Sequence, residues 1–429
     1  MLTRIVQPSP PLCAFLEPLC TQLSAPQRQH LQELCDALLV CESEHTLAGL
    51  QRQFVTTTDV SNWADFLRIS PWEAEALRIE LLRAQIAWAI SHAEKNGHAQ
   101  ELYLNLDDSL GEKDKATTRL EPVDWHHDHN ESTPRRPRYK KSFCYLACTL
   151  SIGDFTLTLD VRLYLRARTV RALNRHRAPD ARLPFRSKNA LARAMLQRIA
   201  PWLPPDWQVI VQFDSWYASN KLLKFVHRQG WQFTCGVKFT RLLNGVRLDQ
   251  QHHRLRHKHH TKIRVVAADE TTQSYYVRQI EGRFKKLPLD LRVLITKRHL
   301  GQQTRPAYFA TTRLACKPQA TLQGYGRRWS CEVVNWYLKN PLGLADFRVR
   351  SYEAVDKYVV AVHLALAYVE RRLAVERSAT LKNCGDVIRR HRDEHAEAWL
   401  RAAVEMAQRP GTTLEQVLQR FLRNEAVAE

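Results

Sequence analysis

The sequence has no Cys-x-x-Cys pair, although it contains ten cysteines. Cysteines at that spacing are typical of zinc sites and redox motifs, so neither is predicted from them. Unpaired thiols are typical of a reducing compartment, where cysteine behaves as a small buried hydrophobic residue. We therefore expect neither a disulfide framework nor a cysteine-based metal site.

Long apolar runs are also missing. No stretch approaches the roughly 18 to 20 apolar residues that a membrane-spanning helix needs. The longest candidate, residues 355–369, is interrupted by Asp356, Lys357 and His363. The first residues, MLTRIVQPSPPLCAF, lack the apolar core and cleavage site of an export signal. These absences favour a soluble, cytoplasmic protein.

Acidic residues are in deficit, with 44 Asp and Glu against 64 Lys and Arg, which gives a formal net charge of +20. Such an excess causes self-repulsion, and a polyanionic partner is its simplest explanation. The hydrophobic content of 44% supports packed cores and excludes wholesale disorder. A chain of 429 residues is long enough for two or three domains.

The first part of the chain is predicted to be helical. Between about residues 26 and 96, apolar residues recur at helical spacing, as at Leu77 and Leu81. A capping box at residues 70–73, Ser-Pro-Trp-Glu, predicts that a helix starts there. We interpret residues 1–98 as a helical DNA-binding domain, mainly because of the global charge. A helical lid without a ligand is the alternative.

Strands interleaved with helices follow. Leu102, Leu104 and Leu106 alternate with polar residues and predict a half-buried strand that carries Asp107 at its carboxyl end. A strand over residues 207–213 delivers Asp214 in the same way. Further strands are predicted over residues 143–149, 155–165 and 233–239, and helices over 187–200 and after 217. This order predicts a mixed α/β core with its functional groups at the strand ends.

Two segments are rich in histidine and positive charge. Residues 126–129 read His-His-Asp-His and precede a basic run at 135–141, whereas residues 252–260 combine histidines with Arg and Lys. Adjacent histidines rarely complete a metal coordination sphere, so a solvated loop is favoured at 126–129. Phosphate contact is an interpretation for both basic runs. Short β-prone pieces over residues 241–312 predict a β-rich insertion.

The stretch from Tyr325 to Lys339, YGRRWSCEVVNWYLK, is predicted to be one helix that Pro341 terminates. At 100° per residue, Tyr325, Arg328, Glu332 and Lys339 fall within about 60° of one another. A solvated charged face is the simple explanation. However, three carboxylates, Asp107, Asp214 and Glu332, in so basic a protein fit cation binding. Two-metal phosphoryl transfer with Mg²⁺ or Mn²⁺ is the chemistry that uses such a set.

The chain resembles bacterial insertion-sequence transposases of the DDE class, in the branch marked by a Tyr-Arg-Glu-Lys signature. Tyr325, Arg328, Glu332 and Lys339 match that signature without a gap. VIVQFDSWYASNKLL is similar to the second-aspartate segment of the family and contains Asp214. LNLDDSL is similar to the first-aspartate segment. There Asp107, followed by Ser at the second position where the family usually has Thr, fits best and Asp108 is the alternative.

The resemblance implies an RNase H-like mixed sheet with helices, a β-rich insertion before the helix of the catalytic Glu, and helical terminal regions. It implies that Asp107, Asp214 and Glu332 bind two Mg²⁺ or Mn²⁺ ions. Tyr325, Arg328 and Lys339 would contact phosphates around the scissile bond at the transposon end. Similar enzymes with this signature often pass through a hairpin intermediate on that end. Arg327 and Trp329 are further candidate DNA contacts, with Trp336 as an alternative stacking aromatic. The implied partners are double-stranded DNA and a second copy of the chain, and the implied location is the bacterial nucleoid.

These inferences divide the chain into a helical DNA-binding domain (1–98), a catalytic core in two parts (99–240 and 313–350), the β-rich insertion (241–312) and a helical C-terminal region (351–429). Two other functions use the same residues. One is a domesticated transposase that retains DNA binding as a repressor or recombination factor. The other is an RNase H-like nuclease that cuts DNA without strand transfer.

Overall fold

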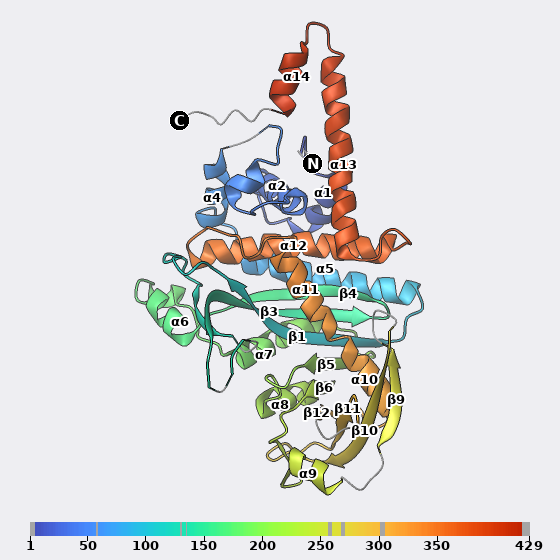
Figure 1. Cartoon of the computed structure of the whole chain (residues 1–429). Coiled ribbons are helices and arrows are strands. Elements are labelled where there is room, and N and C mark those ends of the chain that lie inside the picture. Colours follow the sequence, from blue (N-terminus) through green and yellow to red (C-terminus); the bar gives the residue numbers. More distant parts are fainter. Residues whose placement is uncertain are drawn as a thin grey trace.

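The computed structural model describes residues 5–56, 59–128, 131–133, 135–255, 260–266, 271–300 and 305–422. One mixed sheet of ten strands crosses the middle of the molecule (Figure 1). Its strands are β1 (Glu101–Glu112), β2 (Asp124–His127), β3 (Tyr139–Ile152), β4 (Phe155–Tyr164), β5 (Gln208–Phe213), β6 (Gln232–Gly236), β9 (Thr261–Val266), β10 (Thr272–Gly282), β11 (Leu291–Lys297) and β12 (Ala307–Thr311). The short strands β7 (Leu242–Leu243) and β8 (Val246–Arg247) pair separately.

The central part of the sheet has the order β4-β3-β1-β5-β6. Strand β3 is antiparallel to both β4 and β1, whereas β1, β5 and β6 run parallel. This order and these directions are those of an RNase H-like sheet, so the predicted fold class is confirmed. Strand β12 is antiparallel to β6, and β11, β10 and β9 continue outward from it. The strands predicted between residues 241 and 312 therefore exist and extend the central sheet.

Helices surround the sheet and form the terminal regions. They are α1 (Pro10–Leu16), η1 (Glu17–Leu19), α2 (Ala25–Val40), α3 (Leu47–Gln51), α4 (Val60–Arg68), α5 (Ala74–Lys95), α6 (Ala167–Asn174), η2 (Pro179–Ala181), α7 (Lys188–Ile199), η3 (Ala200–Trp202), α8 (Asn220–Arg228), α9 (Leu248–Arg254), α10 (Pro318–Gly326), α11 (Trp329–Lys339), α12 (Tyr352–Glu376), α13 (Cys384–Ala407) and α14 (Leu414–Phe421). In Figure 1, α10 and α11 cross the front of the sheet and α12 runs along its β4 edge.

Two large hydrophobic clusters hold these layers together. One packs Leu102, Leu104 and Leu106 of β1 against apolar residues of α7 and α8 on one face of the sheet. The other contains residues of α1 to α5, the carboxyl-terminal half of α11, α12 and the start of α13, together with β3 and β4 residues such as Tyr145. The N- and C-terminal helices therefore share one core along the β4 edge of the sheet.

Strand β1 differs from its prediction in two ways. It runs on to Glu112, so Asp107 lies in the middle of the strand and not at its end. Residues 102–106 are buried on both faces, because α10 and α11 cover the face that was expected to meet solvent. A sequence pattern reports which side chains are polar, but it does not report what covers them.

Several helix boundaries also differ from prediction. The helix expected at Ser70 begins at Ala74, and the Ser70 hydroxyl accepts a hydrogen bond from Gln27 at 2.9 Å, so no capping box forms there. The sequence predicts a capping box from Thr412 to Glu415 at the start of the last helix, but Thr413 caps it. The sequence pattern predicts the preceding helix over residues 394–408, whereas α13 begins ten residues earlier, at Cys384. Its early turns pack on α2 and α12, and tertiary packing of this kind supports turns of weak helical pattern.

His126 and His127 lie in strand β2, paired with Lys140 and Tyr139 of β3, and not in the predicted loop. Their neighbour His129 and residues 256–259 of the second histidine-rich segment lie outside the described residues. All ten cysteines are free and seven of them are buried, as predicted. In the described part of the chain, every helix is too short or too polar to cross a membrane.

Candidate functional site

The register of two parallel strands brings Asp107 and Asp214 to the same place. Leu106 of β1 is paired with Phe213 of β5, and this is the last pair between these strands. The residue after Leu106 is Asp107, and the residue after Phe213 is Asp214. Since neighbouring strands lie about 4.8 Å apart, the two carboxylates start from adjacent backbone positions.

Helix α11 adds a third carboxylate and a guanidinium. Arg328, at the N-cap of α11, donates from Nη2 to Oε1 of Glu332 at 2.8 Å. Its Nη1 lies 3.4 Å from Oδ2 of Asp107. Arg328 therefore bridges the carboxylate of the strand and the carboxylate of the helix.

The alternation of β1 explains why α11 meets these groups. Odd-numbered residues face α10 and α11: the Asn105 amide donates to the hydroxyl of Ser330 at 3.3 Å, and Lys339 donates to the hydroxyl of Ser109 at 3.0 Å. Asp107 lies between Asn105 and Ser109 on the same face. The polar side of the strand thus forms a row of partners beneath the helix.

The single helix predicted from Tyr325 to Lys339 is interrupted. Helix α10 ends at Gly326 and α11 begins at Trp329. Between them the backbone N–H groups of Arg328 and Cys331 donate to carbonyls three residues earlier, which tightens the turn. The four side chains nevertheless stay together: Tyr325, Arg328 and Lys339 contact the sheet, and Glu332 contacts Arg328.

Tyr325 is anchored against the strand that ends in Asp214. Its hydroxyl donates to the backbone carbonyl of Phe213 at 3.3 Å, and its ring meets Phe309 of β12 edge to face at 4.9 Å. The guanidinium of Arg328 lies 5.9 Å from the centre of the Tyr325 ring. Burial raises the pKa of Tyr325, so the phenol remains protonated and available as a donor.

Asp108 points to the opposite face of β1 from Asp107. Its Oδ1 accepts a hydrogen bond from the Tyr217 hydroxyl at 2.6 Å, and its Oδ2 lies 2.5 Å from Nζ of Lys188 on α7. The backbone N–H of Tyr217 in turn donates to Oδ1 of Asp214 at 3.3 Å, next to a 2.9 Å bond from the N–H of Trp216. Asp108 therefore ties the turn that carries Asp214 to β1.

Sequence reasoning missed this network. Tyr217 was visible three residues after Asp214, but nothing in the pattern connected it to Asp108. Lys188 gave no signal at all, because its partner lies 80 positions earlier.

The electrostatics of the site favour a bound cation. Burial raises the pKa of Asp107 to about 7; Arg328 opposes this shift, and the charges of Asp108 and Asp214 add to it. Burial also raises the pKa of Asp214, against the two backbone hydrogen bonds of its turn. One guanidinium thus compensates only part of the negative charge.

The donor set consists of carboxylate oxygens, which fit hard divalent cations. Within the described residues, however, the one group of three potential ligands whose atoms all lie within 4.8 Å of one another is elsewhere, at Asp36, His391 and His395. Asp107 and Glu332 are held apart by the guanidinium that both contact. An ion would therefore take the place of Arg328 between them.

The family model of the DDE superfamily endonucleases matches residues 18–283, which is more than half of the chain. The chain belongs to this family. The match includes Asp107 and Asp214 and ends before Glu332. Comparison with curated proteins found no match. Membership makes the protein an endonuclease-type enzyme of a superfamily whose nucleases use divalent metals.

The other candidate DNA contacts of the endonuclease are Arg327, Trp329 and Trp336. Arg327 donates to the carbonyl of Gly153 in the β3–β4 turn and lies 5.0 Å from the ring centre of Tyr103, so it faces the hairpin turn. Trp329 is 58% exposed and Trp336 is 53% exposed. Both side chains of α11 are therefore largely open to solvent.

The first histidine-rich segment of the endonuclease does not form a metal cluster among the residues that the structure describes. His126 is buried, and burial together with Lys188 and Arg166 lowers its pKa to about 4, so its ring is neutral. Lys140 of the adjacent basic run lies 3.1 Å from Asp128 and 2.7 Å from Glu131. These contacts organise the end of the β2–β3 ribbon.

Proposed function

We propose that this endonuclease is a DNA transposase of the Tyr-Arg-Glu-Lys branch. It cleaves DNA at insertion-sequence ends and joins the freed 3′-hydroxyl to a target. The observation that carries the proposal is the Arg328 bridge between Asp107 and Glu332, beside Asp214, on an RNase H-like sheet. The signature residues Tyr325, Arg328 and Lys339 contact the sheet, and Glu332 contacts Arg328, as the proposal expects of residues around one metal site.

Asp107, Asp214 and Glu332 are the proposed ligands of two Mg²⁺ or Mn²⁺ ions. When bound, such ions activate the attacking oxygen and stabilise the leaving oxygen of an in-line displacement. The protein's own task is to fix the carboxylates. The β1–β5 register sets Asp107 beside Asp214. The backbone N–H groups of Trp216 and Tyr217 donate to the Asp214 carboxylate and orient it.

The phosphate contacts follow from the same geometry. Lys339 is the last residue of α11, and its ammonium donates to the hydroxyl of Ser109. Burial and the positive charge of Lys140 lower the pKa of Lys339. A phosphate would relieve that repulsion. Arg328 and the Tyr325 hydroxyl supply donors nearer the carboxylates, and Trp329 or Trp336 presents an aromatic face for a displaced base.

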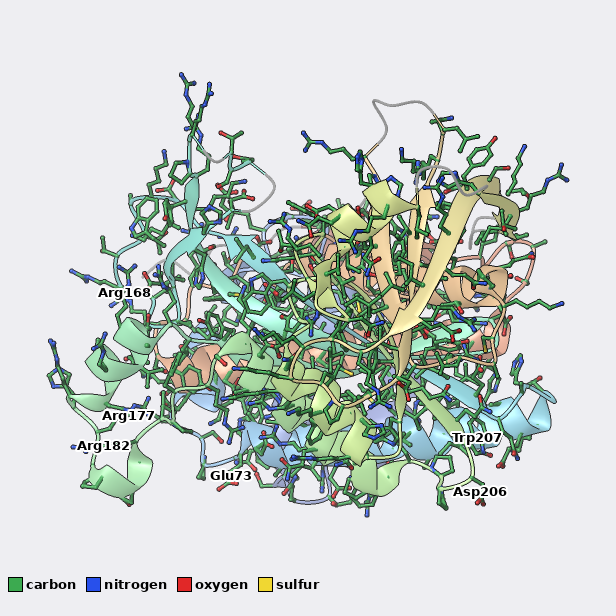
Figure 2. The ribbon with its side chains drawn as sticks, turned by 90° about the horizontal axis from the view of Figure 1, so that it is seen from below. Glu73, Arg168, Arg177, Arg182, Asp206 and Trp207 are labelled. Carbon is green, nitrogen blue, oxygen red and sulfur yellow. The ribbon has the colours of Figure 1, made fainter. Side chains whose placement is uncertain are left out.

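A basic lobe offers a second DNA contact. Arg168, Arg177 and Arg182 lie on the lobe formed by α6 and η2, at the opposite side of the molecule from Asp206 and Trp207 (Figure 2). Arg168 and Arg177 pair with Asp124 and Glu353, but Arg182 has no acidic partner within the described residues. The excess positive charge of the chain supports double-stranded DNA as the partner. In the proposed complex a homodimer binds the DNA, with one transposon end per subunit.

The decisive experiment uses the DNA that flanks the gene. A plasmid carrying the flanking inverted repeats is incubated with the protein, Mg²⁺ and a supercoiled target. We expect cleavage at the repeats and covalent joining to the target, both abolished by Asp214→Ala or Glu332→Ala while binding to end DNA persists. Unimpaired cleavage by either variant would refute the site assignment.

The products separate the alternative functions. An RNase H-like nuclease would cut without forming joined products. A domesticated factor would bind DNA but would neither cut nor join it. Imperfect inverted repeats bordered by a short direct duplication around the gene would favour the transposase over the domesticated factor.

A further inference from the structure

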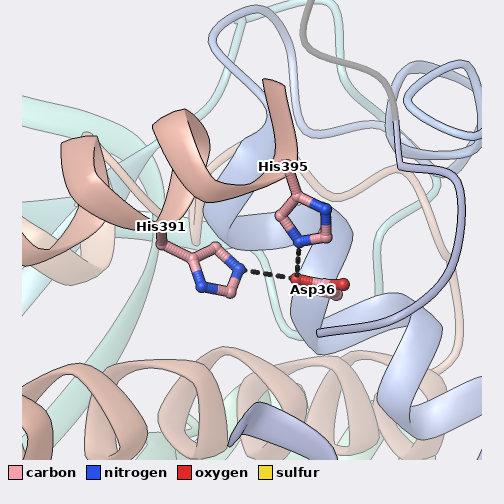
Figure 3. Close-up of side chains that lie close together, drawn as sticks. All are labelled: Asp36, His391 and His395. Carbon is pink, nitrogen blue, oxygen red and sulfur yellow. Dashed lines mark hydrogen bonds and ion pairs between the residues drawn. The ribbon is translucent and has the colours of Figure 1, made fainter. Parts of the chain in front are cut away.

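Three ionisable side chains meet in the helical layer, away from α10 and α11. Asp36 belongs to α2, and His391 and His395 belong to α13 (Figure 3). Asp36 and His391 have no exposed side-chain surface, and the side chain of His395 is 5% exposed. Neither the carboxylates of the catalytic site nor the phosphate-contacting residues touch this cluster.

The geometry directs both imidazoles at one carboxylate oxygen. Nε2 of His391 lies 2.6 Å from Oδ1 of Asp36, and Nε2 of His395 lies 2.9 Å from the same atom. The other oxygen of Asp36 accepts the backbone N–H of Ser9 at 2.8 Å. The histidines are four residues apart on α13, so they project from one face of the helix.

These atoms form a familiar ligand set for a transition-metal ion. Two histidines four residues apart on a helix, with a carboxylate from another element, match the nitrogen and oxygen ligands that zinc prefers. The three ligand atoms lie within 4.8 Å of one another. An ion bonded at about 2.0–2.1 Å would separate them by roughly 3.4 Å, so small side-chain rotations would admit it.

A bound ion would take the place of imidazole protons at this cluster. Without an ion, Nε2 of each histidine donates to Oδ1 of Asp36. Nδ1 of His391 is buried and has no hydrogen-bond partner within the described residues. With an ion on Nε2, the His391 ring would carry its proton on Nδ1 instead. The Ser9 bond holds the Asp36 carboxylate in place in either case.

We propose that Asp36, His391 and His395 bind a structural Zn²⁺ ion that fastens α13 to α2. Three protein ligands leave one coordination position, which a water molecule would fill. Because the cluster is buried, a substrate does not reach that position, and the role of the ion is to join segments 355 positions apart in the chain. This site is separate from the proposed catalytic ions, and the inference holds whether or not the protein transposes DNA.

The test uses the full-length chain, without an affinity tag, carrying Asp107→Asn, Asp214→Asn and Glu332→Gln to remove the catalytic carboxylates. The protein is stripped with a chelator and titrated with ZnCl₂, and bound zinc is counted by mass spectrometry. We expect one Zn²⁺ per chain and a rise in Tm of about 5 °C at saturating zinc. Mg²⁺ should produce neither effect. If no Zn²⁺ ion binds tightly to the chain, the proposal is overturned. This test leaves Asp36, His391 and His395 unaltered.

Variants then locate the ion. His395→Gln and Asp36→Asn should weaken Zn²⁺ binding by at least about tenfold, the loss expected when a ligand is removed. His363→Gln is the matched control, because His363 is a buried histidine of α12 whose one hydrogen-bond partner in the described part of the chain is the carbonyl of Thr158, at 3.0 Å. Equal zinc affinity in His395→Gln and the unaltered cluster would overturn the assignment. If the cluster variants do not fold, the d–d spectrum of bound Co²⁺ decides, since tetrahedral nitrogen ligation supports the site and an octahedral spectrum refutes it.

Discussion

Two consecutive aspartates of β1 have different surroundings because a strand alternates its faces. Asp107 meets Arg328 beneath α11, whereas Asp108 meets Tyr217 and Lys188 on the other face. The sequence left open which of them is the metal ligand. We propose Asp107 as the ligand, because it lies beside Arg328 and Asp214, and Asp108 as a positioning residue, because its oxygens are taken by Tyr217 and Lys188.

The two residues should respond differently to the same substitution. Asp107→Asn should abolish metal-dependent cleavage, since it removes a ligand. Asp108→Asn should leave detectable cleavage but lower its rate, and destabilise the fold by about 1–3 kcal/mol, because the ammonium of Lys188 loses its buried partner. Cleavage assays and urea unfolding measure the two effects. Tyr217→Phe is the control for the turn, and a dead Asp108→Asn beside an active Asp107→Asn would reverse the assignment.

Phosphate contact by Lys339 is a second prediction at this scale. Lys339→Ala should weaken binding to end DNA and reduce the slope of log K against log salt by about one, since each lost phosphate contact releases fewer counterions. Arg328→Ala should do the same. Binding titrations between low and moderate salt measure the slope. Arg327→Ala serves as the comparison, because Arg327 faces the β3–β4 turn, and equal slopes in all proteins would return Lys339 to a structural role.

At the scale of elements, the sequence predicted most strands and helices, but it did not predict where they end or which helices pack on each face of a strand. The strands at residues 261–312 were legible because β-branched and aromatic residues alternate there between turns. The sequence did not predict the break between α10 and α11, since Arg327 and Arg328 keep helical dihedral angles. Only the hydrogen-bond pattern changes there, because the N–H groups bond to carbonyls three residues earlier and not four. The network that joins Asp108, Tyr217 and Lys188 depends on side chains brought together from three elements, which no local pattern records.

The contact between α12 and β4 is predicted to make stability depend on pH. Glu370 is buried and accepts the N–H and hydroxyl of Thr158, both at 2.6 Å. Burial raises its pKa from 4.5 to about 8. The folded state therefore holds a proton that the unfolded state has lost, and the free energy of unfolding falls as the pH rises from about 4.5 through 8.

Glu370→Gln should remove that dependence, because the amide keeps the shape and the hydrogen bonds without the charge. At about pH 9 the variant should be more stable than the wild type by several kcal/mol, since a pKa difference of one is worth about 1.4 kcal/mol, and near pH 4 the two should agree. Denaturant unfolding across this range measures the difference. Stability curves that run parallel at every pH would contradict the prediction.

At the scale of the whole molecule, one core crosses the boundary that the sequence suggested at residue 98. Residues of α1 to α5 pack in the same cluster as α12 and α13. Residues 1–98 expressed alone should therefore remain largely unfolded, since they lose the apolar surface of α12. Circular dichroism and amide exchange measure this. The same segment mixed with residues 99–429 should gain helix, and a cooperatively folded isolated segment would show an independent domain.

In the proposed function, the guanidinium that bridges Asp107 and Glu332 would couple the binding of a cation to these carboxylates with the binding of a phosphate to Arg328. A cation that takes both carboxylates leaves Arg328 free for a phosphate, and a phosphate that takes Arg328 leaves both carboxylates free for a cation. The coupling is reciprocal, so each ligand should tighten the other by the same factor. Such positive cooperativity would keep the metal-loaded, cutting-competent state scarce wherever DNA ends are absent.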